Sequence, residues 1–311
     1  MLKILVADEI SNEGIEILRK AGFIVDLNFD ISYDDLKRII GNYDGLIVRS
    51  RTKVDRSIIE AGVNLRFIGR AGVGLDNIDV KAAEERNIIV FNTPEAPSTS
   101  VSELFFGLLL SLVRKISICD KLMKMGEWPK RHAMGFELRG KTLGIIGLGR
   151  IGREIAKRAK AFEMHVIYYD IVRPDTSVER ELGVQYMDFD NLLRNSDIVT
   201  IHLPLTPQTY HLINEDKLKI MKKGAILVNT SRGAIIDGKA LLNYLKNGHL
   251  YGACLDVFEN EPPKEPWEKE LISLENVVAT PHIGSMTIEA QDRAAVILAN
   301  KIIEFFRGKG L

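Results

Sequence analysis

The chain has 311 residues, of which 46% are hydrophobic and 27% are charged, as in a folded globular protein of about two domains. Its 42 basic residues balance 42 acidic ones, so net charge indicates neither a nucleic-acid partner nor an anionic membrane. The longest apolar run, residues 104–113, is half the roughly 20 residues of a membrane span. Residues 1–4 lead directly into an expected strand, so a signal peptide is not expected. We therefore expect a cytoplasmic protein with no membrane and no nucleic-acid partner.

The first part of the chain alternates apolar runs with amphipathic stretches, which predicts a parallel sheet with helices on both faces. Strands are expected at 3–7, 24–27, 45–49, 66–69 and 88–91, with helices such as 12–20 and 33–40 between them. After a break at 92–97, residues 98–126 are expected to form one long helix. Its start, with Ser100 three residues before Glu103, fits a capping box.

The same alternation resumes at residue 143. Strands are expected from there and at 166–169, 198–202, 225–229, 252–256 and 277–279, with helices at 188–194, 215–220, 238–246 and 287–306. The prediction is an α/β protein with two doubly wound, Rossmann-like parallel-sheet domains and a ligand cleft between them. Residues 1–96 plus 285–311 would form the substrate domain, and residues 97–284 the dinucleotide-binding domain.

A glycine-rich turn is the most specific motif in the chain. Residues 143–146 lead into Gly147-Leu148-Gly149-Arg150-Ile151-Gly152, a G-x-G-x-x-G pattern between an expected strand and an expected helix. Gly147 permits the tight turn, Gly149 lets a pyrophosphate approach the backbone, and Gly152 lets the helix pack closely on the strand. The helix N-terminus then presents N–H groups and partial positive charge to the phosphates. This spacing predicts a dinucleotide site.

The residue after the next expected strand indicates which dinucleotide is bound. Asp170 follows residues 165–169 and lies 23 positions after Gly147, where it could accept hydrogen bonds from both adenosine ribose hydroxyls. Its charge would repel the 2′-phosphate of NADP. Arg173 is the competing residue that could receive this phosphate, but the residue directly after Asp170 is Ile171, which is not basic. NAD is therefore expected.

Three residues at later strand ends fit the oxidation of a 2-hydroxy acid. Arg232 offers a planar cation for a carboxylate, and His282, with an ordinary pKa of about 6.5, is suited to carry the hydroxyl proton. Glu261 could pair with that imidazole and raise its pKa, although Glu259, only two residues away, is a competing partner.

Other polar residues have less specific interpretations. Asp256 could contact the nicotinamide ribose or carboxamide, and the loop 69–74 could bring backbone N–H groups and Arg70 near an anionic substrate. No cluster has metal-ligand spacing, so no metal is expected. Residues with expected structural roles are Cys119, Cys254, His132, His165, His211 and His249, while His202, Leu203 and Pro204 would line the cofactor.

Four motifs in this order resemble the D-isomer-specific 2-hydroxyacid dehydrogenase family. They are G-L-G-R-I-G at 147–152, N-T-S-R-G at 229–233, D-V-F-E-N-E-P at 256–262 and P-H-I-G at 281–284. The N-terminal half is most similar to the phosphoglycerate dehydrogenase branch, through L-I-V-R-S at 46–50, G-R-A-G-V-G-L-D-N-I-D at 69–79, N-T-P at 92–94 and S-V-S-E at 100–103. The resemblance covers essentially the whole chain.

This resemblance implies roles for particular residues. Arg232, Glu261 and His282 would be catalytic, and Arg49, Ser50, Arg70 and Gly72 would bind the substrate together with Arg232 and His282. The implied NAD-binding residues are Val73, Gly147, Gly149, Arg150, Ile151, Gly152, Asp170, His202, Leu203, Pro204, Thr230, Ser231, Asp256, Gly284 and Ser285. Members are usually dimeric through the cofactor domain, so the helix from Ser98 would contact a second copy, and Arg131 would approach the neighbouring site.

The expected reaction is the NAD-dependent oxidation of D-3-phosphoglycerate, which belongs to serine biosynthesis. Alternatives in the same family are enzymes acting on glyoxylate, hydroxypyruvate, glycerate or D-lactate, and a further alternative is a non-catalytic NAD-sensing corepressor. Two departures from the family matter. Ser98 stands where many members have Asn, and the chain ends at Leu311, so the serine-binding regulatory domain of longer members is not expected.

Overall fold

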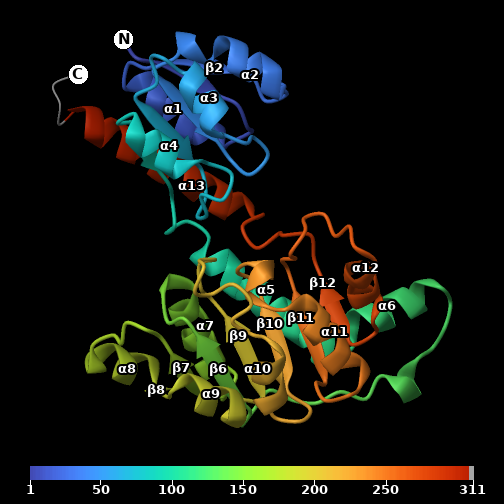
Figure 1. The fold of residues 1–311 in the computed structure, drawn as a ribbon. Coiled ribbons are helices and arrows are strands. Elements are labelled where there is room, and N and C mark those ends of the chain that lie inside the picture. The colour runs from blue at the N-terminus through green and yellow to red at the C-terminus, as the bar shows by residue number, and fades with distance from the viewer. Residues whose placement is uncertain (308–311) are drawn as a thin grey trace. The chain divides into compact units, whose positions relative to one another are not determined.

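The computed structural model describes residues 1–307, except for the side chain of His132. Within it the chain divides into two compact units. One contains Met1–Ser98 and the segment that begins at Ser285, and the other contains Thr99–Gly284 (Figure 1). The chain therefore leaves the first unit once and returns to it once. In this part of the chain, no helix is both long enough and apolar enough to cross a membrane.

The first unit is built on a five-stranded sheet in which every strand pair is parallel, in the order β2-β1-β3-β4-β5. The strands are β1 (Lys3–Val6), β2 (Ile24–Leu27), β3 (Gly45–Val48), β4 (Phe67–Arg70) and β5 (Ile89–Phe91). Side chains alternate along each strand, so Ile4 and Val6 face one core and Leu5 faces another.

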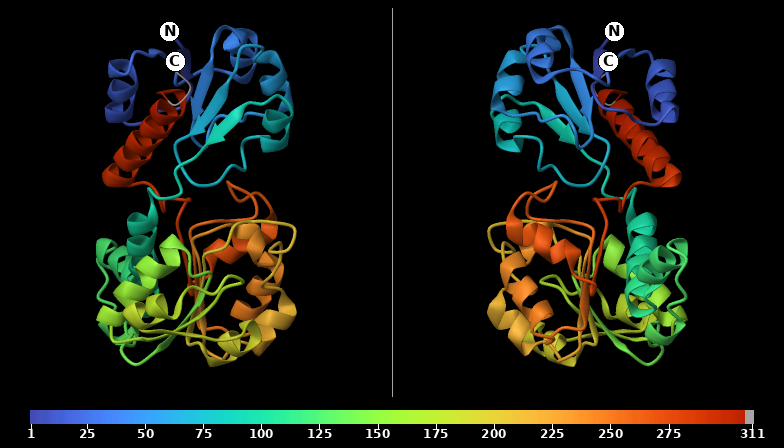
Figure 2. Two further views of the ribbon diagram at one scale, coloured as in Figure 1. Left: turned by 90° about the vertical axis from the view of Figure 1, so that its left-hand side faces the viewer. Right: turned by 90° about the vertical axis from the view of Figure 1, so that its right-hand side faces the viewer.

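Helices cover both faces of this sheet. The helices α1 (Asn12–Lys20) and α13 (Ile288–Arg307) lie side by side on one face (Figure 2). Their buried residues, such as Ile15 and Leu298, belong to the same core cluster as Ile4 and Val6 of β1. The other face is covered by α2 (Tyr33–Ile39), the 3₁₀ turn η1 (Ile40–Asn42), α3 (Arg56–Ala61) and α4 (Val80–Glu85). The first unit is thus completed by the C-terminal helix, because α13 supplies half of one covering layer.

The second unit has a seven-stranded sheet, again with every strand pair parallel, in the order β12-β11-β10-β9-β6-β7-β8. Its strands are β6 (Thr142–Ile146), β7 (His165–Tyr169), β8 (Val184–Tyr186), β9 (Ile198–Ile201), β10 (Ile226–Asn229), β11 (Gly252–Leu255) and β12 (Val277–Ala279). The strand order reverses beside β6, and ligands of doubly wound sheets bind at such a point, beyond the carboxyl ends of the strands.

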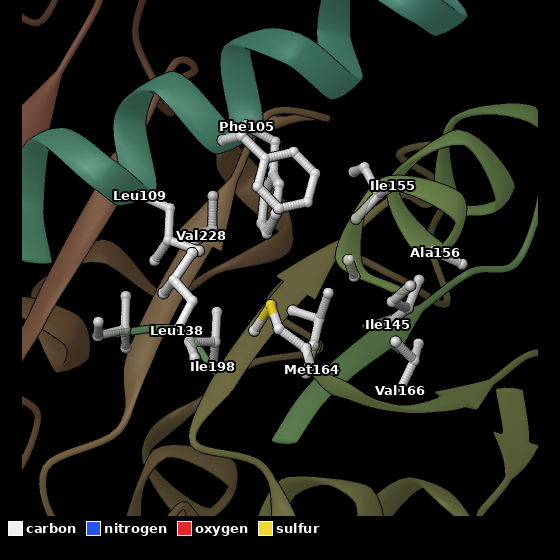
Figure 3. Packing of buried hydrophobic residues seen from close by; sticks show 14 of the residues in the cluster. Phe105, Leu109, Leu138, Ile145, Ile155, Ala156, Met164, Val166, Ile198 and Val228 are labelled. Carbon is white, nitrogen blue, oxygen red and sulfur yellow. The ribbon is translucent and has the colours of Figure 1, made fainter. Parts of the chain in front are cut away.

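Two helical layers bury the faces of this sheet. On one face, Phe105 and Leu109 of α5 (Ser98–Val113) pack with Ile155 of α7 (Arg150–Ala161) and with Ile145 of β6 (Figure 3). The helix α8 (Thr176–Leu182) adds Leu182 to this layer. The other face is covered by α9 (Phe189–Asn195), α10 (Glu215–Ile220), α11 (Gly238–Lys246) and α12 (Pro266–Ser273). This packing confirms the predicted α/β class.

The prediction of one helix over 98–126 is wrong. The helix α5 ends at Val113, Lys115 takes a left-handed conformation with φ 54°, and α6 (Ile116–Lys124) follows. The carbonyl of Val113 accepts a hydrogen bond from Phe136 N at 3.3 Å, so a distant contact helps to end the helix. The predicted capping box is also wrong, because α5 begins at Ser98 and Ser100 lies inside it.

Several short elements were not predicted from the sequence. They are α3, α4, α8, α12 and β8, none longer than eight residues. Segments this short contain few apolar positions, so their structure depends more on packing against the sheet than on a periodic pattern.

The contact between α1 and α13 gives a test of the first unit. A Cβ on Gly14 would lie 2.6 Å from the carbonyl oxygen of Ala295, and backbone atoms cannot move aside as a flexible side chain can. Gly14→Ala should therefore lower stability by about 1–3 kcal/mol and reduce the melting temperature measured by calorimetry. The control is Glu16→Ala, an exposed position of the same helix, and equal melting temperatures for the two variants would contradict this packing.

Candidate functional site

Five loops leave the second sheet at the same edge and at the same level. Along the series β6, β9, β10, β11 and β12, the last residue of each strand pairs with the last residue of the neighbouring strand. The residues that directly follow these ends are Gly147, His202, Thr230, Asp256 and Thr280. The register therefore brings together sequence motifs that lie more than a hundred residues apart.

The three glycines of the turn after β6 differ in what a side chain would meet at their positions. Gly147 has φ 97°, and a Cβ there would lie 2.5 Å from the carbonyl oxygen of His202. A Cβ on Gly152 would lie 2.3 Å from the carbonyl oxygen of Gly147. Gly149 differs, because its φ of −73° suits any residue and a Cβ would meet no protein atom within 4 Å. Space left open in front of Gly149, at the N-cap of α7, fits a ligand that approaches the backbone.

Asp170 is bound to the same turn. Its carboxylate accepts hydrogen bonds from Leu148 N at 2.8 Å and from Val172 N at 3.0 Å, so it fixes the glycine turn to the end of β7. Each oxygen keeps a further lone pair for a ligand. The predicted position of Asp170 beside the turn is therefore present in the structure.

Arg173 is bound by a carboxylate of its own unit. Its Nε and Nη2 donate to Glu179 at 2.8 and 3.1 Å, and the Tyr168 hydroxyl donates to the same carboxylate. The hydrogen bonds from Arg173 and then Tyr168 lower the pKa of Glu179 to about 2. Burial and the Glu179 carboxylate raise the pKa of Tyr168 to about 12. Because Glu179 neutralises Arg173, this arginine is less suited to receive a 2′-phosphate.

A buried amide shapes the loop after β10. The side chain of Asn229 accepts hydrogen bonds from Ser231 N and Oγ at 3.0 and 2.9 Å, and donates to the carbonyl of Arg232 at 2.9 Å. Next to it, the Thr230 hydroxyl is buried without a hydrogen-bond partner among the described residues. A buried hydroxyl is costly to leave unpaired, which fits a ligand bound at Thr230.

Asp256 organises the loop after β12. Its carboxylate is buried and accepts hydrogen bonds from Thr280 Oγ1 at 2.6 Å, Ile283 N at 2.8 Å and Gly284 N at 2.8 Å. Its carbonyl accepts from His282 N at 2.8 Å. The contacts hold His282 at φ 55°, a left-handed conformation that side-chain-bearing residues rarely adopt.

His282 and Glu261 form an ion pair with a hydrogen bond at 2.7 Å between Nδ1 and Oε2. The other oxygen of Glu261 accepts from Phe258 N at 3.2 Å. The hydrogen bond to Glu261 raises the pKa of His282 against the opposing effect of burial. Burial alone would raise the pKa of Glu261, but the bond from His282 lowers it. This pair leaves Nε2 of His282 for a substrate proton.

The competing residue Glu259 does not bind His282. Its carboxylate accepts from Gly238 N at 3.0 Å, at the start of α11, and lies 3.5 Å from Nε2 of His211. His211 therefore contacts a carboxylate near the site, although we expected only a surface or packing role for it.

His202 is neutral and half-buried beside the glycine turn. Its Nε2 lies 2.8 Å from Thr200 Oγ1, and burial lowers its pKa to about 3. Its Nδ1 is buried without a hydrogen-bond partner in the part of the chain that the structure describes. Leu203 and Pro204 continue the chain from it at the same edge.

The substrate-binding residues predicted from the N-terminal half belong to the first unit. Arg49 and Ser50 follow β3, and the buried carboxylate of Asp8 holds this loop through Arg49 N at 2.6 Å, Thr52 Oγ1 at 2.6 Å and Arg51 Nε at 3.1 Å. Burial lowers the pKa of Arg49.

The loop after β4 is the second predicted substrate loop in this unit. Arg70 lies over Gly72, where a Cβ would come within 2.1 Å of its Nη1. The carbonyls of Gly72 and Val73 accept from Thr93 N at 2.8 Å and Asn92 Nδ2 at 2.7 Å. Ser285 also belongs to the first unit, and its carbonyl accepts from Gln291 Nε2 at 2.7 Å.

Sequence reasoning missed the supporting residues Asp8, Asn229 and Glu268. Each is a buried polar side chain that binds loop backbone groups. Two of them had a sequence signal. Asn229 begins the N-T-S-R-G motif, and Glu265-Pro266-Trp267-Glu268 is the start pattern of a helix, which the structure contains as a capping box. Among the described residues, no group of three His, Cys, Asp or Glu side chains could hold a metal ion.

Comparison with known proteins identifies relatives of the whole chain. Residues 106–284 match the family described as D-isomer specific 2-hydroxyacid dehydrogenase, NAD binding domain. A D-3-phosphoglycerate dehydrogenase of Archaeoglobus fulgidus is 46% identical over 309 residues, which are 99% of this chain but only 58% of that protein. A hydroxypyruvate reductase of Thermotoga maritima is 47% identical over 302 residues, 97% of each protein. The solved structure of the TT0316 protein from Thermus thermophilus superposes with a TM-score of 0.89 at 33% identity, covering 99% of this chain and 97% of that one.

The His282–Glu261 pair predicts a specific pH behaviour. Because Glu261 raises the pKa of His282, the pair's contribution to stability begins to fall above pH 6.5 and is lost as pH rises through the folded-state pKa of His282. Because His282 lowers the pKa of Glu261, the contribution is also lost as pH falls below 4.5 through that folded-state pKa. NMR titration of the imidazole should give a midpoint above 6.5.

The matched variants for this titration are Glu261→Gln and Glu259→Gln. Only the first removes the carboxylate on Nδ1, so only the first should lower the midpoint of His282. An equal change in both variants, or no change in Glu261→Gln, would contradict the pairing.

Proposed function

This chain belongs to the D-isomer specific 2-hydroxyacid dehydrogenase family, and we propose that it oxidises D-3-phosphoglycerate to 3-phosphohydroxypyruvate with NAD. The reaction would supply the keto acid from which serine is made. The observation that carries the proposal is the His282–Glu261 pair, held at the same sheet edge as the glycine turn and Arg232. Relatives with the name D-3-phosphoglycerate dehydrogenase support the choice of substrate.

The residues of the second unit fit a bound NAD, which supplies the hydride acceptor for the oxidation. The N-terminus of α7 and the open space at Gly149 would bind the pyrophosphate, and Asp170 the adenosine ribose. The hydroxyl of Thr230 offers an unused hydrogen bond to the ligand. The remaining residues of this unit proposed to contact NAD are Gly147, Arg150, Ile151, Gly152, His202, Leu203, Pro204, Ser231, Asp256 and Gly284. Val73 and Ser285, which belong to the first unit, are also proposed to contact NAD.

Three residues would act on the reacting part of the substrate. The guanidinium of Arg232 binds the carboxylate through two parallel hydrogen bonds. Nε2 of neutral His282 accepts the C2 hydroxyl proton as the hydride leaves C2, and the proton returns from His282 in the reverse reaction. Glu261 receives the Nδ1–H hydrogen bond and stabilises the imidazolium that forms. Oxidation therefore needs deprotonated His282, and reduction needs protonated His282.

The first unit would bind the rest of the substrate. Arg49 and Ser50 follow β3, Arg70 is the last residue of the adjacent strand β4, and Gly72 lies on the loop after it. The two arginines supply the positive charge that a phosphate needs, together with backbone N–H groups near Gly72. We assign this set to the phosphate end of the substrate.

A second candidate function is reduction of hydroxypyruvate or a related unphosphorylated 2-keto acid. The observation in its favour is the Thermotoga maritima hydroxypyruvate reductase, because 97% of its length matches this chain. The catalytic residues would be the same, and Arg49 and Arg70 would then bind a carboxylate alone. An NAD-sensing binding protein without turnover is the remote alternative.

We also propose that the chain forms a homodimer through the second unit. Large apolar side chains are exposed on α6 and in the segment after it, namely Ile116, Met123, Met125, Trp128 and Met134. Burial of such a group against a second copy would remove its apolar surface from water. Arg131, exposed in the 3₁₀ turn η2 (Lys130–His132), would then be near the partner's site. Light scattering with Trp128→Ser tests this assembly.

The substrate assignment is tested by NAD reduction at alkaline pH with 3-phosphoglycerate, D-glycerate and D-lactate. We expect the phosphorylated acid to give the highest kcat/KM. Arg49→Ala or Arg70→Ala should raise its KM by roughly 10- to 100-fold, because each loses a charged hydrogen bond to phosphate, and should leave the KM for NAD unchanged. Arg56→Ala is the control, since Arg56 pairs with Glu85 on the surface of the same unit. Higher kcat/KM for the unphosphorylated acids would favour the second candidate function.

The acid–base role is tested by His282→Asn. Loss of a general base lowers turnover by roughly 100- to 10,000-fold, and the Kd of NAD, measured by calorimetry, should change little. Asparagine suits this position because it tolerates the left-handed backbone of residue 282. An equal loss of NAD affinity and turnover would show that His282 acts mainly through cofactor binding.

A further inference from the structure

Glu268 is a buried carboxylate outside the four family motifs at 147–152, 229–233, 256–262 and 281–284. It lies in the first turn of α12 and is 1% exposed. Its oxygens accept hydrogen bonds from Asn260 N at 3.0 Å, Asn260 Nδ2 at 3.2 Å, Lys264 N at 2.9 Å and Glu265 N at 3.0 Å. Burial opposes the charge, but these bonds lower the pKa of Glu268 overall. The side chain is therefore a buried, ionised carboxylate that connects several N–H groups of the preceding turn.

The residues whose N–H groups bind Glu268 lie on both sides of Glu261 in the sequence. Glu261 is the residue that pairs with His282, the candidate catalytic histidine. Asn260 directly precedes Glu261, and Lys264 and Glu265 follow it by three and four residues. Glu261 is otherwise fixed by its contacts to Phe258 N and His282. The direction in which Glu261 points therefore depends on how the turn 260–265 is held.

We propose that Glu268 is a positioning residue, whose carboxylate holds the turn 260–265 in the conformation that keeps Glu261 paired with His282. The inference deepens the proposed function, and its kinetic part rests on it. Only a carboxylate can accept all of these hydrogen bonds, because all four partners are N–H donors and an ionised carboxylate is purely an acceptor. A glutamine would point its own N–H groups at some of these donors and leave them unpaired.

The other charged groups near Glu261 and Glu268 are the same in the wild type and in a variant of Glu268. His282 is faced by Glu261, Asp256 and Arg232. Glu268 is faced by backbone and amide donors of the turn, while Glu259 is bound to Gly238 N on α11. Replacing Glu268 therefore changes the turn without touching the group that contacts His282.

The test is the NMR titration of His282 in Glu268→Gln, with Glu270→Gln as the matched control. Glu270 lies on the same helix, is exposed and pairs with Lys246. In Glu268→Gln the imidazole midpoint should fall toward 6.5, and in Glu270→Gln it should stay at the wild-type value. If the midpoint falls by one unit, reduction of a 2-keto acid above both midpoints should slow roughly tenfold, with the Kd of NAD unchanged.

An unchanged midpoint in folded Glu268→Gln would overturn the proposal. If that variant does not fold, Asn260→Ala decides, because it removes one exposed donor to Glu268 and should shift the midpoint in the same direction by less. No shift in Asn260→Ala would then overturn it. The two proposals can fail separately because the titration needs no substrate. A wild-type protein without turnover would refute the proposed function, whereas the role of Glu268 would still be decided by the NMR titration.

Discussion

The hydrogen bonds between Asp256 and the loop at 280–284 are the constraint on which the candidate site depends. They hold His282 in a left-handed conformation that costs roughly 1–2 kcal/mol for a residue with a side chain. Because the carboxylate binds N–H groups at 283 and 284, the loop cannot relax while these bonds remain. The orientation of the imidazole toward Glu261 follows from this loop conformation.

Buried polar side chains hold three other loops at the carboxyl ends of strands in the same way. Asn229 holds the Arg232 loop, Glu268 holds the Glu261 turn, and Asp8 holds the Arg49 loop. In each case a buried polar side chain binds backbone donors or acceptors, and the loop that it holds carries a charged residue that is partly or fully exposed. Buried groups of this kind are costly to disturb, which keeps the charged side chains of these loops in position.

The sequence predicted the features that depend on local residue chemistry. The alternation of strands and helices and the choice of NAD are confirmed. The tight turn expected at Gly147 is present, and Gly147 and Gly152 meet steric limits that only glycine satisfies. The choice between Glu259 and Glu261 could not be made, since both lie on one short loop and the difference depends on contacts with α11 and His282.

The supporting residues were also beyond sequence reasoning. Glu268 resembles any helix-capping residue, and its partners belong to the preceding turn. The break at Lys115 likewise involves a hydrogen bond from Phe136, which lies 21 positions later. Such features arise from contacts between segments, and no pattern within a segment contains them.

The central claim is that one proton on His282, held by Glu261, links the two directions of a 2-hydroxyacid dehydrogenase reaction. The most direct measurement is the pH dependence of kcat/KM for oxidation of 3-phosphoglycerate and for reduction of its keto acid, in the wild type and in Glu261→Gln. We predict that oxidation rises and reduction falls with pH through the same ionisation, and that this ionisation moves to lower pH in Glu261→Gln. Parallel pH profiles in the two directions, or an ionisation that does not move, would contradict the account.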